Sequence, residues 1–190
     1  ERGVPGQANI VLPFSAHLAF DKAAHLMDIE VRRIPIQENS FTADVGKMEA
    51  ACDENTVMVV GSAPNFPYGI IDPISELSDM CQRHELWLHV DACVGGFLAP
   101  FARMNGEDIP AFDFELSGVQ SMSADLHKYG YCAKGASTVL FRSEALFKYM
   151  PFDFDCWSGG RMVTPTLAGT RPGGAISAAW AVMNHLGVQG

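Results

Sequence analysis

Three segments of this 190-residue chain carry side chains that could do chemistry. Asp91 ends an apolar run, where a carboxylate needs a structural cap, an ion pair or a cationic ligand to offset its desolvation. Lys128 lies in the semi-apolar segment His-Lys-Tyr, which suits an amine nucleophile as well as an ordinary surface lysine. His17 opens a helical pattern, either as a helix-terminal residue or as a ligand-binding one. Each residue alone leaves both readings open.

The segments that must position these residues alternate between strand and helix patterns. We expect strands at Ile29–Ile36, Thr56–Ser62, Trp87–Cys93 and Ser137–Phe141, and helices at His17–Met27, Val45–Asp53, Ile74–His84 and Gly174–Leu186. This alternation predicts an α/β fold in which a mostly parallel sheet is covered by helices on both faces. Ligands of such sheets bind at the carboxyl ends of the strands, which points to Asp91, Cys93 and the loop after Ser62.

Composition limits the partners and the compartment. The chain has 13 basic and 22 acidic residues, a net charge of −9, which excludes nucleic acid as its main partner because phosphate backbones require a basic surface. Its five cysteines are odd in number and contain no C-x-x-C pair, which argues against a disulfide framework and favours a reducing compartment. We therefore expect a cytoplasmic or cytosol-facing protein, and a membrane anchor before residue 1 remains compatible with that location.

Common nucleotide-binding, hydrolase and metal signatures are missing from the sequence. It contains no G-x-x-x-x-G-K-[ST], no G-x-G-x-x-G after a strand and no G-x-S-x-G. His17, His89, Asp91 and His127 are metal-ligand types, but only His89 and Asp91 are close in sequence and no H-E-x-x-H is present. The pattern therefore predicts no metal site.

Four motifs taken together resemble one family. They are S-A-H-x-x-F-D-K-A-A at 15–24, H-V-D-A-C-x-G-G-F at 89–97, S-A-D-x-H-K-Y-G-Y-x-x-K-G at 123–135 and G-x-R-P-G-G at 169–174. This set resembles the fold-type I, pyridoxal-phosphate-dependent decarboxylases of group II over nearly the whole chain. The resemblance implies that residues 1–190 are the central part of the cofactor-binding large domain, a mostly parallel mixed sheet between helices. The family's glycine-rich phosphate loop would then precede residue 1, and its small domain would follow residue 190.

The resemblance implies roles for four residues around the pyridoxal 5′-phosphate ring. Lys128 is similar to the lysine that binds the cofactor as a Schiff base, and Asp91 to the partner of the pyridinium nitrogen. His17 resembles the imidazole that stacks on one face of the ring. Cys93 would touch the opposite face, where many relatives have alanine.

It also implies three phosphate contacts. His127 and Thr170 resemble residues that bind the cofactor phosphate, with Thr170 reaching the site of a partner subunit. Thr170 stands where the family has serine and keeps the hydroxyl. Lys134 resembles a lysine that binds a substrate phosphate, and a solvated loop lysine is the alternative.

Within the family, the blocks around Lys128 and Arg171 are more similar to lyases than to decarboxylases. They imply a homodimeric enzyme that cleaves the Cα–Cβ bond of a phosphorylated sphingoid base in a retro-aldol reaction, releasing a long-chain aldehyde and phosphoethanolamine. Two alternatives stay open: a group II decarboxylase of glutamate or an aromatic amino acid, and a non-catalytic fragment or pseudoenzyme. Because the glycine-rich loop is not found within residues 1–190, the isolated segment is expected to be inactive even if the full protein is the lyase.

Overall fold

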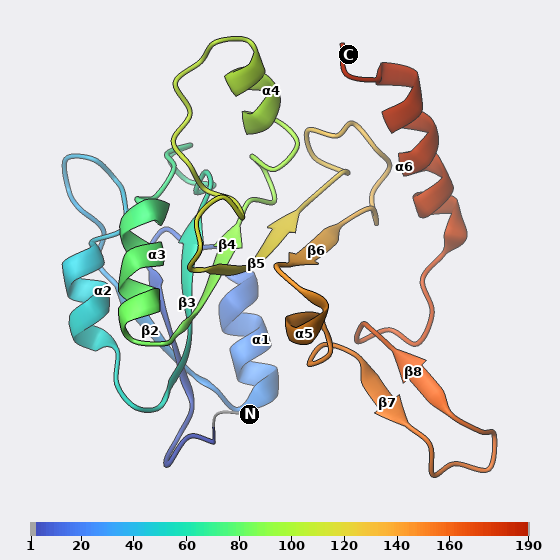
Figure 1. Cartoon of the computed structure of the whole chain (residues 1–190), viewed down its shortest axis with the longest axis horizontal. Coiled ribbons are helices and arrows are strands. Elements are labelled where there is room, and N and C mark those ends of the chain that lie inside the picture. The colour runs from blue at the N-terminus through green and yellow to red at the C-terminus, as the bar shows by residue number, and fades with distance from the viewer. Residues whose placement is uncertain (1–2, 190) are drawn as a thin grey trace.

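The computed structural model describes residues 3–189 and contains a six-stranded sheet in the order β2-β1-β3-β4-β5-β6 (Figure 1). Strands β1 to β5 pair in parallel and β6 is antiparallel to β5. The sheet strands are β1 (Asn9–Pro13), β2 (Glu30–Ile34), β3 (Thr56–Ser62), β4 (Trp87–Asp91), β5 (Val119–Ala124) and β6 (Thr138–Phe141). The predicted mixed, mostly parallel sheet is confirmed.

Helices cover both faces of this sheet. The helices are α1 (Ala19–Met27), α2 (Val45–Ala51), α3 (Ile74–Arg83), α4 (Ala99–Met104), α5 (Glu144–Phe147) and α6 (Gly173–Leu186). Side chains of successive strand residues point to opposite faces, so Val11 joins the core beneath α2 and α3 while Ile10 and Leu12 join a second core beneath α1. The buried strand residues therefore explain why both faces need helices.

A small second unit follows the sheet. Strands β7 (Phe152–Phe154) and β8 (Met162–Thr164) form an antiparallel ribbon that lies to one side of the sheet, next to α5 (Figure 1). Helix α6 packs on the loop that carries Lys128, where Ala179 lies in a small core with Cys132 and Ala136. Among the described residues, no helix is both long enough and apolar enough to cross a membrane.

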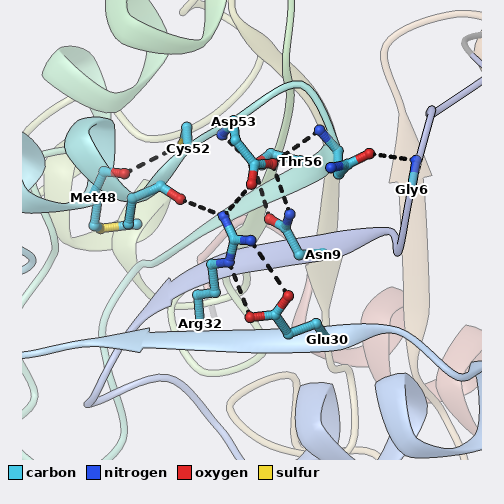
Figure 2. A network of polar contacts seen from close by, with 10 residues as sticks. Gly6, Asn9, Glu30, Arg32, Met48, Cys52, Asp53 and Thr56 are labelled. Carbon is cyan, nitrogen blue, oxygen red and sulfur yellow. Dashed lines mark hydrogen bonds and ion pairs between the residues drawn. The ribbon is translucent and has the colours of Figure 1, made fainter.

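The amino ends of the first three strands are joined by a polar network (Figure 2). Arg32 on β2 contacts Asp53 at 2.8 Å and Glu30 at 3.1 Å. The second oxygen of Asp53 accepts a hydrogen bond from the Asn9 amide at 2.9 Å, and the Thr56 hydroxyl donates to Asn9 at 2.8 Å. These contacts hold the pKa of Asp53 at about 2, through the Asn9 and Arg32 hydrogen bonds first. The network holds these three strands together at their amino ends, away from the carboxyl ends.

We expect Asp53→Asn to lower the melting temperature near neutral pH. Because the folded-state pKa of Asp53 lies below the ordinary value of 3.8, the charged carboxylate stabilises the fold above pH 4, and this contribution disappears as the pH falls toward 2. The difference in melting temperature between the wild type and Asp53→Asn should therefore shrink steadily between these limits. Glu54→Gln, a change of the neighbouring carboxylate, is the control and should show no such trend. An Asp53→Asn difference that is independent of pH would contradict the ion-pair account.

Candidate active site at the carboxyl ends of the strands

A cavity of about 140 Å³ lies at the carboxyl ends of β3 and β4. Its lining residues are His17, Ser62, Pro64, Phe66, Asp91, Cys93, Val94 and Lys128. Four of these, from three separate loops and the end of β4, are residues that the sequence singled out for one ligand: His17, Asp91, Cys93 and Lys128. Asp91 and Lys128 thus lie on the same side of the sheet, as one shared ring would require.

Asp91 is the last residue of β4, and its carboxylate is held at the cavity wall. Its Oδ1 accepts a hydrogen bond from the Cys93 backbone N–H at 3.1 Å and from the Ser123 hydroxyl at 3.3 Å. Its backbone carbonyl accepts from the Ala63 N–H at 2.8 Å, which ties the loop after β3 to the end of β4. The sheet therefore fixes both the backbone and the side chain of Asp91.

Two consecutive glycines, Gly95 and Gly96, allow the chain after Asp91 to pack closely against Ala63 and Ala124. A Cβ atom on Gly95 would lie 2.2 Å from the Ala63 carbonyl oxygen, and one on Gly96 would lie 2.6 Å from the Ala124 Cβ. Neither separation is possible for real atoms, so both positions require glycine. The Gly-Gly pair of the D-A-C-x-G-G motif thus serves close packing at the cavity, and not only a turn.

Lys128 lies in the turn that follows β5, the neighbour of β4. Its ammonium group pairs with the Asp125 carboxylate at 3.1 Å. Asp125 is 6% exposed and also accepts a hydrogen bond from the Ser137 hydroxyl. Burial raises the pKa of Asp125, but the hydrogen bonds from Ser137 and Lys128 outweigh it, so the pKa lies below its ordinary value. A buried, charged carboxylate therefore anchors the amine beside the cavity.

His17 also lines the cavity and lies just before α1. Its Nδ1 accepts a hydrogen bond from the Ala19 backbone N–H at 3.1 Å, which fixes the ring at the start of the helix. Arg33 on β2 holds this loop, donating to the Phe14 carbonyl at 2.9 Å and pairing with Asp21. The hydrogen bond from Arg33 lowers the pKa of Asp21. Arg33 thus positions the His17 loop from an adjacent strand.

Cys93 contributes a neutral thiol to the cavity. Burial raises its pKa to about 12, and the nearby Asp91 charge acts in the same direction. The thiol donates a hydrogen bond to the Ser123 hydroxyl at 3.2 Å. Because the thiolate is the nucleophilic form of cysteine, Cys93 is suited to packing and hydrogen bonding here and not to covalent chemistry.

The remaining predicted site residues lie outside the cavity lining. His127 is next to Lys128, with Nε2 at 3.6 Å from the Asp125 carboxylate. Lys134 is exposed in a turn before Gly135, and Thr170 is exposed in the segment between β8 and α6. Within this single chain, the structure does not bring Lys134 or Thr170 to the cavity.

The residues around the cavity fit a pyridoxal group. Asp91 offers an anionic oxygen suited to a protonated ring nitrogen, Lys128 offers a primary amine, and His17 and Cys93 border the space between them. The Nδ1 atom of His127 is buried and has no hydrogen-bond partner among the described residues, so it could bind an anionic oxygen such as that of a phosphate. In the described part of the chain, no group of three or more His, Cys, Asp or Glu side chains is arranged to hold a metal ion.

Sequence reasoning missed four residues of this site. Asp125 and Asp21 lie inside the quoted motifs. Their negative charge was the available signal that each needs a positively charged partner. Ser123 also lies in a motif, but its contact with Asp91 depends on strand register, which the pattern does not give. Arg33 lies on a strand outside all four motifs, and no local signal identifies it.

Comparison with known proteins identifies the family. Residues 1–155 match the pyridoxal-dependent decarboxylase conserved domain. Because this match covers most of the chain, the protein belongs to the pyridoxal-dependent decarboxylase family, whose cofactor is pyridoxal 5′-phosphate.

The relatives include lyases and a decarboxylase. The chain is 49% identical to the sphingosine-1-phosphate lyase of Oryza sativa over 181 residues, which cover 95% of this chain and 33% of that protein. It is 42% identical to a probable L-tyrosine/L-aspartate decarboxylase of Methanocella arvoryzae, covering 97% of this chain and 47% of the relative. The solved structure of the sphingosine-1-phosphate lyase of Burkholderia pseudomallei superposes with a TM-score of 0.95 at 46% identity, covering 98% of this chain and 43% of that one. The chain thus spans about one third of the rice relative and less than half of the other two.

Proposed function

We propose that this chain is the cofactor-binding core of a pyridoxal-phosphate-dependent lyase that cleaves a phosphorylated sphingoid base into a long-chain aldehyde and phosphoethanolamine. The observation that carries the proposal is the cavity in which Asp91 and Lys128 meet from adjacent strands. The 49% and 46% identities to two sphingosine-1-phosphate lyases support the choice of reaction within the family. The reaction itself belongs to the longer protein of which this chain would be a part.

The residues of the chain would have the following roles in this reaction. When bound, pyridoxal 5′-phosphate supplies an electron-accepting ring that stabilises negative charge on the substrate carbon. Asp91 keeps an anionic oxygen at the cavity wall, which favours a protonated ring nitrogen. Lys128 provides the amine that attaches the cofactor, and Asp125 keeps that amine in place when it is free. His17 and Phe66 would border the cofactor, since both line the cavity.

We further infer that the longer protein is a homodimer in the cytosol or on a cytosol-facing membrane. Thr170 lies outside the cavity of its own chain, which is compatible with a role at a partner subunit's site. On α6, Trp180 is 71% exposed and Ile176 is 60% exposed, an unusual amount of uncovered apolar surface for one helix. The five cysteines are all free thiols, as suits a reducing compartment.

A product assay tests the proposed reaction. The full-length protein is given pyridoxal 5′-phosphate and either a phosphorylated sphingoid base, glutamate or tyrosine. We expect long-chain aldehyde and phosphoethanolamine in equal amounts from the sphingoid base and no carbon dioxide from the amino acids. Carbon dioxide without aldehyde would replace the lyase with a decarboxylase, which the similarity to the Methanocella protein makes the specific alternative. A folded protein that forms no product with any of these substrates would be a pseudoenzyme.

Lys134 provides a test of substrate choice that leaves the cofactor untouched. A charge-assisted contact between an ammonium and a phosphate contributes about 1.5–3 kcal/mol, or roughly tenfold to a hundredfold in affinity. We therefore expect Lys134→Met to raise the KM for the phosphorylated sphingoid base by about that factor and to leave the cofactor absorbance unchanged. Lys148→Met, a change of another lysine outside the cavity lining, is the control. An unchanged KM in Lys134→Met would make Lys134 a solvated loop lysine.

A further inference from the structure

Two serines on β5 face two polar residues on β4 because of the strand register. Asp91 is paired with Ser123, and two pairs earlier His89 is paired with Ser121. Paired residues of parallel neighbours point to the same face, so the hydroxyls stand beside the polar side chains of β4. The Ser121 hydroxyl contacts His89 Nδ1 at 2.8 Å, and that of Ser123 contacts Asp91 Oδ1 at 3.3 Å. Of these four residues, only Asp91 lines the cavity.

The hydrogen bonds around Ser123 have a defined direction. The Cys93 thiol donates to the Ser123 oxygen at 3.2 Å, and it remains protonated because burial raises its pKa to about 12. With its oxygen accepting from the thiol, the Ser123 hydroxyl directs its own hydrogen at Asp91 Oδ1. The hydrogen bonds from the Cys93 N–H and the Ser123 hydroxyl both go to this oxygen, and the Cys93 thiol lies close to the same carboxylate. The other oxygen, Oδ2, is therefore the one available to a ligand in the cavity.

We propose that Ser123 is a positioning residue, which orients the Asp91 carboxylate so that Oδ2 faces the ring nitrogen of the bound cofactor. This inference rests on the proposed function and adds a residue to its site. Without the hydroxyl, only the Cys93 N–H would hold Oδ1, and the carboxylate could rotate about its Cβ–Cγ bond. A rotated carboxylate would bind the ring nitrogen less well, and the ring would lose part of its positive charge.

The test reads the protonation of the ring nitrogen directly. The full-length protein is loaded with pyridoxal 5′-phosphate labelled with ¹⁵N in the ring, and the ¹⁵N chemical shift is measured in the wild type and in Ser123→Ala. We expect the signal of Ser123→Ala to move from the wild-type position toward that of Asp91→Asn. Turnover should fall about tenfold, as expected for one lost hydrogen bond to a charged group, with little change in KM.

Two further variants separate positioning from general destabilisation. Ser123→Thr keeps the hydroxyl and should restore the wild-type ¹⁵N signal. Ser121→Ala removes the other serine of β5, which contacts His89. This variant should have a lower melting temperature and an unchanged ¹⁵N chemical shift. If Ser123→Ala does not fold, Ser123→Cys, which retains only a weak donor, replaces it with the same expected direction of shift.

The outcomes distinguish this inference from the proposed function. A wild-type signal typical of a protonated nitrogen, together with an unchanged signal in a folded Ser123→Ala, would overturn the role of Ser123 alone. An equal shift in Ser121→Ala would also overturn it, because the effect would then be a general one of β5. A full-length wild type that binds no pyridoxal 5′-phosphate would overturn the proposed function, and this inference with it.

Discussion

Replacement of Lys128 by alanine should abolish both the absorbance of the protein-bound cofactor and turnover. Among the residues that line the cavity, Lys128 alone carries a primary amine, so nothing at this wall can replace it. The wild-type full-length protein should be yellow, and its Lys128→Ala variant should be colourless. The measurement is the visible spectrum after loading with cofactor and removal of the excess, followed by the product assay.

Lys128→Arg is the matched control for folding. The guanidinium keeps a positive charge for the buried Asp125 carboxylate but supplies no primary amine. We expect this variant to melt close to the wild type and still to lack absorbance and turnover. An unchanged spectrum in either variant would mean that another lysine, with Lys134 the first candidate, attaches the cofactor.

The second large effect is expected for Asp91→Asn. Asparagine can still accept the hydrogen bonds of Cys93 and Ser123 through its carbonyl oxygen, so the local structure should persist. The amide is neutral, however, and cannot keep a ring nitrogen protonated. Loss of one such electrostatic contact typically costs about 10²–10³-fold in turnover, and we expect a decrease of that order.

Stability measurements distinguish the two readings of Asp91. If it acts on the cofactor, the melting temperature of the cofactor-free Asp91→Asn protein should stay near that of the wild type while turnover collapses. A residue that served only as a cap at the end of β4 would give parallel losses of stability and activity. Parallel losses would therefore contradict the assignment of Asp91 to the ring nitrogen.

Sequence patterns predicted the sheet well where strands have strong local signals. The bounds of β3 were predicted as observed, because the β-branched run Thr56–Ser62 lies between polar turns. No bounds were predicted for strands β1 and β5: β1 ends in Pro13, and β5 is half serine and glutamine, so neither resembles an isolated apolar strand. These two strands adopt their structure through pairing with neighbours, which local periodicity does not record.

The site could be predicted in part for a related reason. The rule that ligands bind at the carboxyl ends of parallel strands was enough to expect Asp91 at the cavity, whereas only the family resemblance placed Lys128, 37 residues further along the chain, at the same ligand. The supporting contacts of Ser123 and Arg33 depend on which residue of one strand faces which residue of the next. Such register is a property of the folded sheet, and the positions of these two residues in the sequence do not reveal it.

The proposed attachment of pyridoxal 5′-phosphate to Lys128 in this cavity is tested by locating the bound cofactor on the chain. Borohydride treatment of the cofactor-loaded full-length protein converts an imine into a stable amine, and mass spectrometry of the peptides then identifies the modified lysine. We predict that the cofactor is found on the peptide that contains Lys128 and that Asp91→Asn gives the same peptide. Modification of Lys134 instead, or of no lysine within residues 1–190, would contradict the account.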